Sequence, residues 1–330
     1  MAFPWASWSV RPASGYPMCI DQRHSFTRRA CLAALLLLLP GIVAATSWQH
    51  EQGTLTLDKT PTRVVALNWA ATESLLLLGI TPVGVADKEG YAYWVREPAL
   101  PEDVPNIGTR VSPSLEAIAE LNPDLIVTST EMAPAANLLE EIAPTYVISV
   151  YKEGARPYDK AREMLLTLGD ILDRKAEAEA VLADISNTLE HQRQRLADHG
   201  LNNKPVALLN FMDDRHVRVY TSNGLFQEAL DSLDLKNAWP HPGSYWGFST
   251  VGLEAIAPYS DSRLVILEPI RPGLTDQLAN SPFWTYLAPV QQDEIYQIDA
   301  AWPFGGVFPV KRIAVQLADA LVKGGSDNVH

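Results

Sequence analysis

Apolar and polar residues alternate along the chain in blocks that predict strands and helices in turn. Residues 63–67 form a short apolar run that predicts a buried strand, and residues 83–86 predict a second one. The apolar stretch between these runs ends at Gly79, which is typical of a helix that stops at a glycine. A strand, a helix and a strand in this order predict a βαβ unit.

The same order of elements returns twice more in the first half of the chain. Residues 113–127 read as a helix followed by a strand, and residues 138–150 repeat that pattern. Such alternation is typical of a mostly parallel sheet with helices on its faces, so we expect an α/β fold.

A short sequence from the first half recurs in the second half. Residues 115–119 and 253–257 both read LEAIA, and each copy leads into an apolar run that predicts a strand, at 125–127 and at 264–267. The recurrence favours two related α/β lobes, while coincidence among alanine-rich helices is the alternative.

One long helix is predicted between the two halves. Apolar residues recur at helical spacing over residues 173–198, with Asp173 as the expected N-cap and Gly200 as the stop. At 1.5 Å per residue this helix would be about 39 Å long, enough for a stiff strut. We therefore expect an N-terminal α/β lobe at residues 46–172 and a C-terminal α/β lobe at residues 199–330, joined by this helix.

The start of the chain has the three-part plan of an export signal. Arg28 and Arg29 precede an apolar run at residues 32–45, and small residues end that run. The run is shorter than the roughly 20 residues that a membrane span requires. We expect a cleaved signal peptide at residues 1–45, which fits either the general secretory route or the twin-arginine route.

Met18 and both cysteines fall in this segment. The residues before Met18 do not resemble a targeting signal, so Met1 and Met18 are both open as the start. Cys19 and Cys31 precede the expected cleavage point, so the mature chain would contain no thiol and no disulfide. Because a lipid-modified cysteine would follow the apolar run, we expect a soluble exported protein and not a lipoprotein.

Composition and charge exclude several classes of function. Of the 330 residues, 47% are hydrophobic and 20% are charged, which is typical of a globular chain with a sizeable core. The formal net charge is -13, and removal of residues 1–45 takes away four of the 26 basic and one of the 39 acidic residues, which leaves -16. Nucleic-acid binding requires clustered Lys and Arg, so we expect no DNA or RNA partner.

Motifs of catalysis and of metal binding are missing from the sequence. It contains no GxSxG, HExxH, P-loop or GxGxxG pattern, and its acidic residues form no convincing catalytic pair. The seven histidines lack the paired spacing of a zinc site. We expect a protein that is not an enzyme, and an exported α/β hydrolase with an aromatic cleft is the alternative.

Tryptophans in loop-like contexts are the unusual feature of this chain. Core packing is the ordinary role of a single tryptophan, but four in such contexts favour a lined pocket. A mostly apolar cleft with one or two charged groups is typical of a small-molecule site. The four are Trp94, Trp239, Trp246 and Trp302. Their aromatic neighbours are Tyr91, Tyr93, Tyr245 and Phe304.

Arg110 is the candidate charged group of that pocket. It follows a short extended stretch and precedes a predicted helix, so its guanidinium would project from the edge of the first lobe into the cleft. A guanidinium there can donate forked hydrogen bonds to anionic oxygens. A surface salt bridge is the ordinary alternative for this residue.

Six segments carry a resemblance to a known family. They are residues 63–87, 90–101, 108–110, 225–228, 237–239 and 245–247. In order and spacing they resemble the periplasmic ferric-hydroxamate (ferrichrome-type) siderophore-binding proteins of Gram-negative bacteria, over nearly the whole mature chain. The resemblance implies the helical-backbone class of substrate-binding proteins, with two α/β lobes, a long connecting helix, a shallow cleft and delivery to an inner-membrane ABC permease.

The resemblance also implies the residues that contact the ligand. In that family an arginine hydrogen-bonds the iron-bound hydroxamate oxygens, and it matches Arg110. The iron belongs to the siderophore, so no cofactor and no protein metal ligand are implied. The aromatic wall matches Trp94, Trp239, Trp246 and Trp302, and the eight predicted ligand-binding residues are these four, Arg110, Met132, Tyr245 and Phe304.

Two tyrosines of the family are replaced here. The one that shares the hydroxamate contact falls at Met132, which removes a hydroxyl donor and leaves Arg110 as the main polar anchor. The other falls at Phe304, which keeps the ring and loses only its polar tip. These departures concern the identity of the ligand more than its class.

The charge pattern separates the candidate cargos. A triscatecholate iron complex is highly anionic and would need several converging cations, whereas this site offers Arg110 in an acidic protein. A roughly neutral ferric trihydroxamate suits one arginine and many aromatic faces. The aromatic wall alone does not exclude another iron chelate, haem or cobalamin, so these stay as alternatives.

The resemblance finally implies docking to the permease through acidic residues on the two lobes. Glu254 matches the acid of the C-terminal lobe. Its N-terminal counterpart falls at Asn137, so Glu140 or Glu141 would have to serve. The sequence therefore predicts a monomeric periplasmic receptor that captures a ferric hydroxamate siderophore and presents it to an ABC importer.

Overall fold

A computed structural model describes residue 15 and residues 45–324 of the chain. Apart from these two residues, the predicted signal peptide at 1–45 lies outside the described part. Over residues 45–324 no helix combines the length and the apolar character that a membrane crossing needs.

The first half of the chain forms a sheet of four parallel strands in the order β4-β3-β7-β8. Helix α2 (Trp69–Leu77) connects the first two of them, so the predicted βαβ unit is confirmed. All four strands are buried, as is typical of parallel strands with helices on both faces. They are β3 (Val64–Ala66), β4 (Gly84–Val85), β7 (Leu125–Thr128) and β8 (Thr145–Val147).

The second half forms a five-stranded sheet in the order β11-β10-β9-β12-β13. Strands β9, β12 and β13 are parallel, whereas β10 is antiparallel to both of its neighbours. The short connection at residues 212–215 makes β10 antiparallel to β9, because parallel strands need a much longer crossover. The strands are β9 (Val206–Phe211), β10 (His216–Tyr220), β11 (Phe248–Gly252), β12 (Arg263–Leu267) and β13 (Ile295–Ile298).

The two LEAIA copies fold differently, although both lead into a strand. The first forms helix α4 (Leu115–Glu120), and the second forms only the 3-10 turn η5 (Leu253–Ile256). Pro258 follows the second copy directly and has no backbone N–H with which to donate the next helical hydrogen bond, so this helix ends after one turn.

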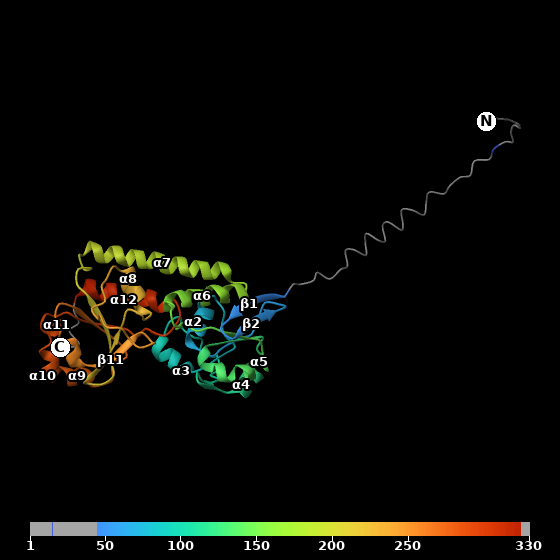
Figure 1. Ribbon diagram of the computed structural model, residues 1–330, viewed down its shortest axis with the longest axis horizontal. Helices are drawn as coiled ribbons and strands as arrows, with labels where there is room; N and C mark the ends of the chain where they lie inside the picture. The colour runs from blue at the N-terminus through green and yellow to red at the C-terminus, as the bar shows by residue number, and fades with distance from the viewer. Residues whose placement is uncertain (1–14, 16–44, 325–330) are drawn as a thin grey trace, which may run out of the picture. The chain divides into compact units, whose positions relative to one another are not determined.

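Helix α7 (Lys175–Asp198) runs along helices from both halves of the chain (Figure 1). It begins one residue later than predicted, because Asp173 has a left-handed backbone with φ of 53° and Arg174 takes the N-cap position. Gly200, with φ of 65°, stands directly beyond the end of the helix, where a stop was predicted. Helix α7 packs against α6 (Pro157–Ile171) and α12 (Phe308–Lys323).

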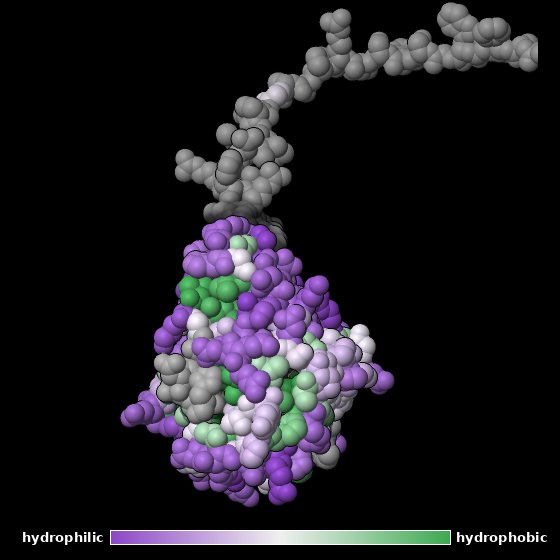
Figure 2. Space-filling view, turned by 90° about the vertical axis from the view of Figure 1, so that its left-hand side faces the viewer, coloured by the Kyte–Doolittle hydropathy of each residue, from purple (hydrophilic) through white to green (hydrophobic). Residues whose placement is uncertain are grey.

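The α/β fold with a long helix along both sheets agrees with the fold class predicted from the sequence. The lobe boundaries at residues 172 and 199 stay a prediction. Figure 2 shows a largely hydrophilic surface, broken by smaller hydrophobic areas, at the end of the molecule that carries α9, α10 and α11. The remaining elements are β1 (Thr46–His50), β2 (Gly53–Leu57), α3 (Lys88–Gly90), η3 (Tyr91–Val95), β5 (Gly108–Thr109), β6 (Ser112–Pro113), η4 (Thr130–Ala135), α5 (Ala136–Glu140), α8 (Phe226–Ser232), α9 (Leu274–Ala279), α10 (Pro282–Thr285) and α11 (Ala288–Gln291).

Candidate ligand-binding site

Two neighbouring pockets open where the carboxyl ends of the parallel strands of both sheets meet. They have volumes of about 230 Å³ and 360 Å³ and share Trp69, Arg110, Trp302 and Phe304. We call them the first and second compartments of one cleft. The first is also lined by Ser129, Thr130, Glu131, Ser149, Tyr245 and Trp246. The second is also lined by Trp94, Asn210, Met212, Arg218, Tyr220 and Glu268.

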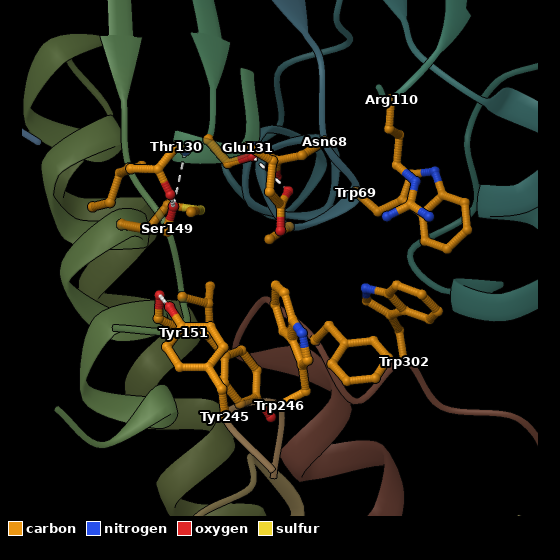
Figure 3. A pocket seen from close by; sticks show the side chains of 16 residues that line it. Asn68, Trp69, Arg110, Thr130, Glu131, Ser149, Tyr151, Tyr245, Trp246 and Trp302 are labelled. Carbon is orange, nitrogen blue, oxygen red and sulfur yellow. Dashed lines mark hydrogen bonds between the residues drawn. The ribbon is translucent and has the colours of Figure 1, made fainter. Parts of the chain in front are cut away.

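The two sides of the first compartment come from different halves of the chain. One side carries polar groups, among which Thr130 and Ser149 join their hydroxyl groups in a hydrogen bond of 2.8 Å. The other side is aromatic. Figure 3 shows Arg110, Trp69, Thr130 and Glu131 across the compartment from Tyr245, Trp246 and Trp302.

Arg110 lies at the tip of the turn between β5 and β6, where Thr109 pairs with Ser112. Its guanidinium carbon is 3.8 Å from the centroid of the Trp69 ring and 5.3 Å from that of the Trp302 ring. Such stacking on an aromatic face is favourable for a cation. Within residues 45–324 the two terminal amino groups of Arg110 have no hydrogen-bond partner, so they are available to a ligand in the cleft.

Asp87 holds both Arg110 and Trp69 in place. Its Oδ2 accepts a hydrogen bond of 3.3 Å from Arg110 Nε, and its backbone carbonyl accepts one of 3.0 Å from Trp69 Nε1. Asp87 has a φ of 56°, a left-handed conformation that aspartate tolerates better than most residues. The sequence analysis missed this role, although Asp87 follows β4 at the sheet edge where ligands of α/β proteins bind.

The aromatic loop after β13 packs tightly on α2. The rings of Trp302 and Trp69 meet edge to face at 4.4 Å, and Phe304 lies 4.9 Å from Trp302. The backbone of Gly305 approaches α2 so closely that a Cβ there would lie 2.4 Å from Cβ of Ala70. Glycine at this position therefore lets the loop lie close to the helix.

Tyr151 joins the loops on the two sides of the first compartment. Its hydroxyl donates to the carbonyl of Pro303 at 2.9 Å and accepts from the backbone N–H of Leu225 at 3.1 Å. Tyr245 in turn donates its hydroxyl to the carbonyl of Tyr151 at 2.6 Å. Burial raises the pKa of Tyr151, so its hydroxyl keeps its proton and this bridge at neutral pH.

Six of the eight predicted ligand-binding residues lie around the cleft, and their role there stays a prediction. They are Trp94, Arg110, Tyr245, Trp246, Trp302 and Phe304.

Trp239 and Met132 are not lining residues of either compartment. Trp239 is 6% exposed and packs in the core of the second sheet beside Tyr259, 5.3 Å from that ring. Its loop context was predicted correctly, but the indole turns inward, which is the ordinary role of a tryptophan. Met132 is also 6% exposed and buried after β7. Both residues therefore lie outside the lining of the cleft, where the sequence had predicted them.

The sequence analysis missed several lining residues that share one signal. Asn68 and Trp69 follow β3, Ser129 to Glu131 follow β7, and Ser149 follows β8. All of them stand at carboxyl ends of parallel strands, which is where open α/β sheets bind ligands.

The predicted docking acids lie at the surface. Glu254 is exposed on η5, and Glu140 and Glu141 are exposed at the end of α5. Their role in docking stays a prediction. Across residues 45–324 no group of three or more His, Cys, Asp or Glu side chains is arranged to hold a metal ion.

Glu73 links the helix that carries Trp69 to α12. Its side chain is 1% exposed, and its Oε1 accepts a hydrogen bond of 2.9 Å from the backbone N–H of Phe308, the first residue of α12. Burial raises the pKa of Glu73 from 4.5 to about 8, although hydrogen bonds from Phe308 and Val307 act in the opposite direction. The carboxyl group is therefore largely protonated at neutral pH.

We expect this buried acid to make stability depend on pH. The unfolded chain loses the proton near pH 4.5 and the folded chain near pH 8, so the stability that Glu73 contributes is complete below pH 4.5 and is lost as the pH rises through about 8. Relative to the native protein, Glu73→Gln should therefore gain up to about 5 kcal/mol in free energy of unfolding across that range, because one pKa unit is about 1.4 kcal/mol. Chemical denaturation at a series of pH values measures this, and a constant difference would contradict the raised pKa.

Comparison with known proteins gives matches over most of the chain. The sequence profile of a family described as periplasmic binding protein matches residues 64–301. The iron(3+)-hydroxamate-binding protein FhuD of Escherichia coli is 32% identical over 261 residues, which are 79% of this chain and 87% of that protein. The Fe(3+) dicitrate-binding periplasmic protein FecB of Escherichia coli is 28% identical over 292 residues, which are 87% of this chain and 93% of that protein.

Among solved structures, one match is a siderophore-binding protein with its ligand. The FhuD protein from Vibrio cholerae, in its crystal structure bound to Fe3+-Desferal, has a TM-score of 0.75 and 28% sequence identity to this chain. The match covers 79% of this chain and 98% of the other.

Proposed function

Because this chain belongs to the periplasmic binding protein family, we propose that it captures a ferric hydroxamate siderophore and presents it to an ABC importer of the inner membrane. The family consists of binding proteins, and two similar proteins are named for iron-hydroxamate or siderophore binding. The observation that carries the proposal is the Arg110 guanidinium, which lines the cleft over Trp69 and whose two terminal amino groups have no hydrogen-bond partner among the described residues.

The chemistry of a ferric trihydroxamate fits this cleft. Six hydroxamate oxygens fill the coordination shell of the iron, so the protein needs no metal ligand. Those oxygens keep partial negative charge and accept charge-assisted hydrogen bonds from Arg110. The aromatic rings of Trp246, Trp302 and Phe304 offer apolar faces to the organic part of the chelate.

The lining of the cleft supports binding over catalysis. A hydrolase of the serine type needs a base beside its nucleophile, most often a histidine. In the part of the chain that the structure describes, no histidine lines either compartment. Ser129 instead donates its hydroxyl to the Glu131 carboxylate at 2.9 Å.

The proposal also includes the location of the protein in the cell and the permease to which it docks. The export signal expected at residues 1–45 would send the protein to the periplasm as a soluble monomer. Glu254 on the second half, with Glu140 or Glu141 on the first half, would meet basic residues of the permease. These acids lie on exposed surface, which the role requires.

A fluorescence titration tests the proposed cargo. Trp69, Trp246 and Trp302 line the cleft, so a bound ferric chelate should quench tryptophan emission. We expect saturable quenching of the purified protein by ferrichrome, and none by iron-free ferrichrome at the same concentration. A ferric triscatecholate, haem and cobalamin serve as competitors. Tight binding of one of these, with no response to any ferric hydroxamate, would contradict the proposal.

A further inference from the structure

The second compartment contains a cation that the sequence analysis did not single out. Arg218 lies in β10 between Val217 and Val219, which are both fully buried in the core of the second sheet. Because side chains alternate along a strand, Arg218 emerges on the opposite face, where it lines the second compartment. Its guanidinium carbon is 4.1 Å from the centroid of the Phe248 ring.

Arg218 differs from Arg110 in its ionic partners. Arg110 is paired with Asp87 at 3.3 Å, whereas no carboxylate in residues 45–324 lies within 4.0 Å of the Arg218 guanidinium. Its Nε is buried and has no hydrogen-bond partner among the described residues. The side chain of Arg218 hydrogen-bonds the neighbouring Tyr220, but no described carboxylate balances its charge, so this position favours an anionic occupant of the cleft.

The acidic residue that lines the second compartment together with Arg218 already interacts with other side chains. Glu268 also lines the second compartment, but its Oε2 lies 3.5 Å from Arg96 Nη1 and its Oε1 accepts a hydrogen bond of 3.0 Å from Gln297. In the first compartment the Glu131 carboxylate accepts a hydrogen bond from Ser129 but pairs with no cation among the described residues, so it would repel an anion. Charge therefore directs an anionic group of a ligand toward Arg218 and away from Glu131.

We propose that Arg218 binds a carboxylate at the periphery of the siderophore while Arg110 receives the hydroxamate oxygens. This inference rests on the proposed function and adds to it a preference, within ferric hydroxamates, for those that carry a free carboxylate. The two compartments share Trp69, Arg110 and Trp302, so one ligand can occupy both. The planar guanidinium of Arg218 matches a carboxylate with two parallel hydrogen bonds.

Two derivatives of one chelate test the role of Arg218. N-acetyl-ferrioxamine B and N-succinyl-ferrioxamine B have the same ferric trihydroxamate centre, and only the second ends in a carboxylate. We expect the native protein to bind the succinyl form about ten-fold more tightly, the effect of one hydrogen-bonded charge. Arg218→Gln should abolish this difference and keep the affinity for the acetyl form, and Arg218→Lys should keep part of the difference because it keeps the charge.

Arg174→Gln is the matched control, because Arg174 is exposed at the start of α7, where it pairs with Glu177 and donates a hydrogen bond to the carbonyl of Asp173. It should keep the full preference for the succinyl form. Equal affinity of the native protein for both derivatives, or an undiminished preference in Arg218→Gln, would overturn the inference and leave the proposed function intact. Failure of the native protein to bind either derivative would overturn the proposed function, and this inference with it.

Discussion

Replacement of Arg110 by glutamine should lower the affinity for a ferric trihydroxamate about 100-fold, because charge-assisted hydrogen bonds contribute up to about 3 kcal/mol. Glutamine keeps a hydrogen-bonding amide but loses the charge and the planar fork of donors. It also removes the cation that stacks on Trp69. The dissociation constant from fluorescence titration with ferrichrome measures the effect.

Arg174→Gln is again the control for this substitution, since Arg174 lies away from both compartments. Its dissociation constant should match that of the native protein. Asp87 and Trp69 are unchanged in both variants, so the wall of the cleft is preserved. Equal binding by Arg110→Gln and Arg174→Gln would show that Arg110 is not the anchor.

Gly306→Ala should destabilise the protein by about 3 kcal/mol, at the upper end of the usual effect of a single substitution. Gly306 has a φ of 74°, and an added Cβ would lie 2.0 Å from Oε1 of the buried Glu73. The carboxyl group of Glu73 is buried and accepts a hydrogen bond from the backbone N–H of Phe308, so it can move away from the added Cβ only by giving up that hydrogen bond. The displaced loop carries Trp302 and Phe304, so weaker ligand binding should accompany the loss of stability.

Gly154→Ala separates the two causes of the lower stability of Gly306→Ala, which are the left-handed backbone and the contact of the added Cβ with Glu73. Gly154 has a φ of 76°, nearly that of Gly306, but nothing lies within 4 Å of the added Cβ. Only the left-handed backbone is then unfavourable, at a cost of about 1 kcal/mol. Chemical denaturation compares the two variants. Equal losses of stability would mean that the contact between Gly306 and Glu73 is not what fixes the loop.

The hydrophobic pattern was enough to predict the helices and strands whose formation depends on local sequence. The βαβ unit at residues 64–85 follows from buried apolar runs on either side of an apolar helix. The second LEAIA copy was predicted as a helix because its own residues favour one, while Pro258 just beyond it decided the outcome. The antiparallel β10 was missed because the turn at residues 212–215 was not read as a hairpin.

Residues of the site could be predicted where their own sequence context is distinctive, and not where their role depends on distant residues. Arg110 stood out as a lone cation between a strand and a helix, and the loop tryptophans stood out by context. Trp239 has the same context but turns into the core, which only tertiary packing decides. Asp87 and Arg218 gain their significance from residues far along the chain, the first from Arg110 and the second from the absence of a nearby carboxylate among the described residues.

A crystal structure of the protein with a ferric trihydroxamate, with the iron located by its anomalous scattering, tests the binding site most directly. We predict one iron in the cleft, with hydroxamate oxygens at hydrogen-bonding distance from the terminal amino groups of Arg110 and rings of Trp246 and Trp302 against the ligand. All six ligands of the iron should come from the siderophore. An iron outside the two compartments, or one bound directly by a protein side chain, would contradict the proposed function.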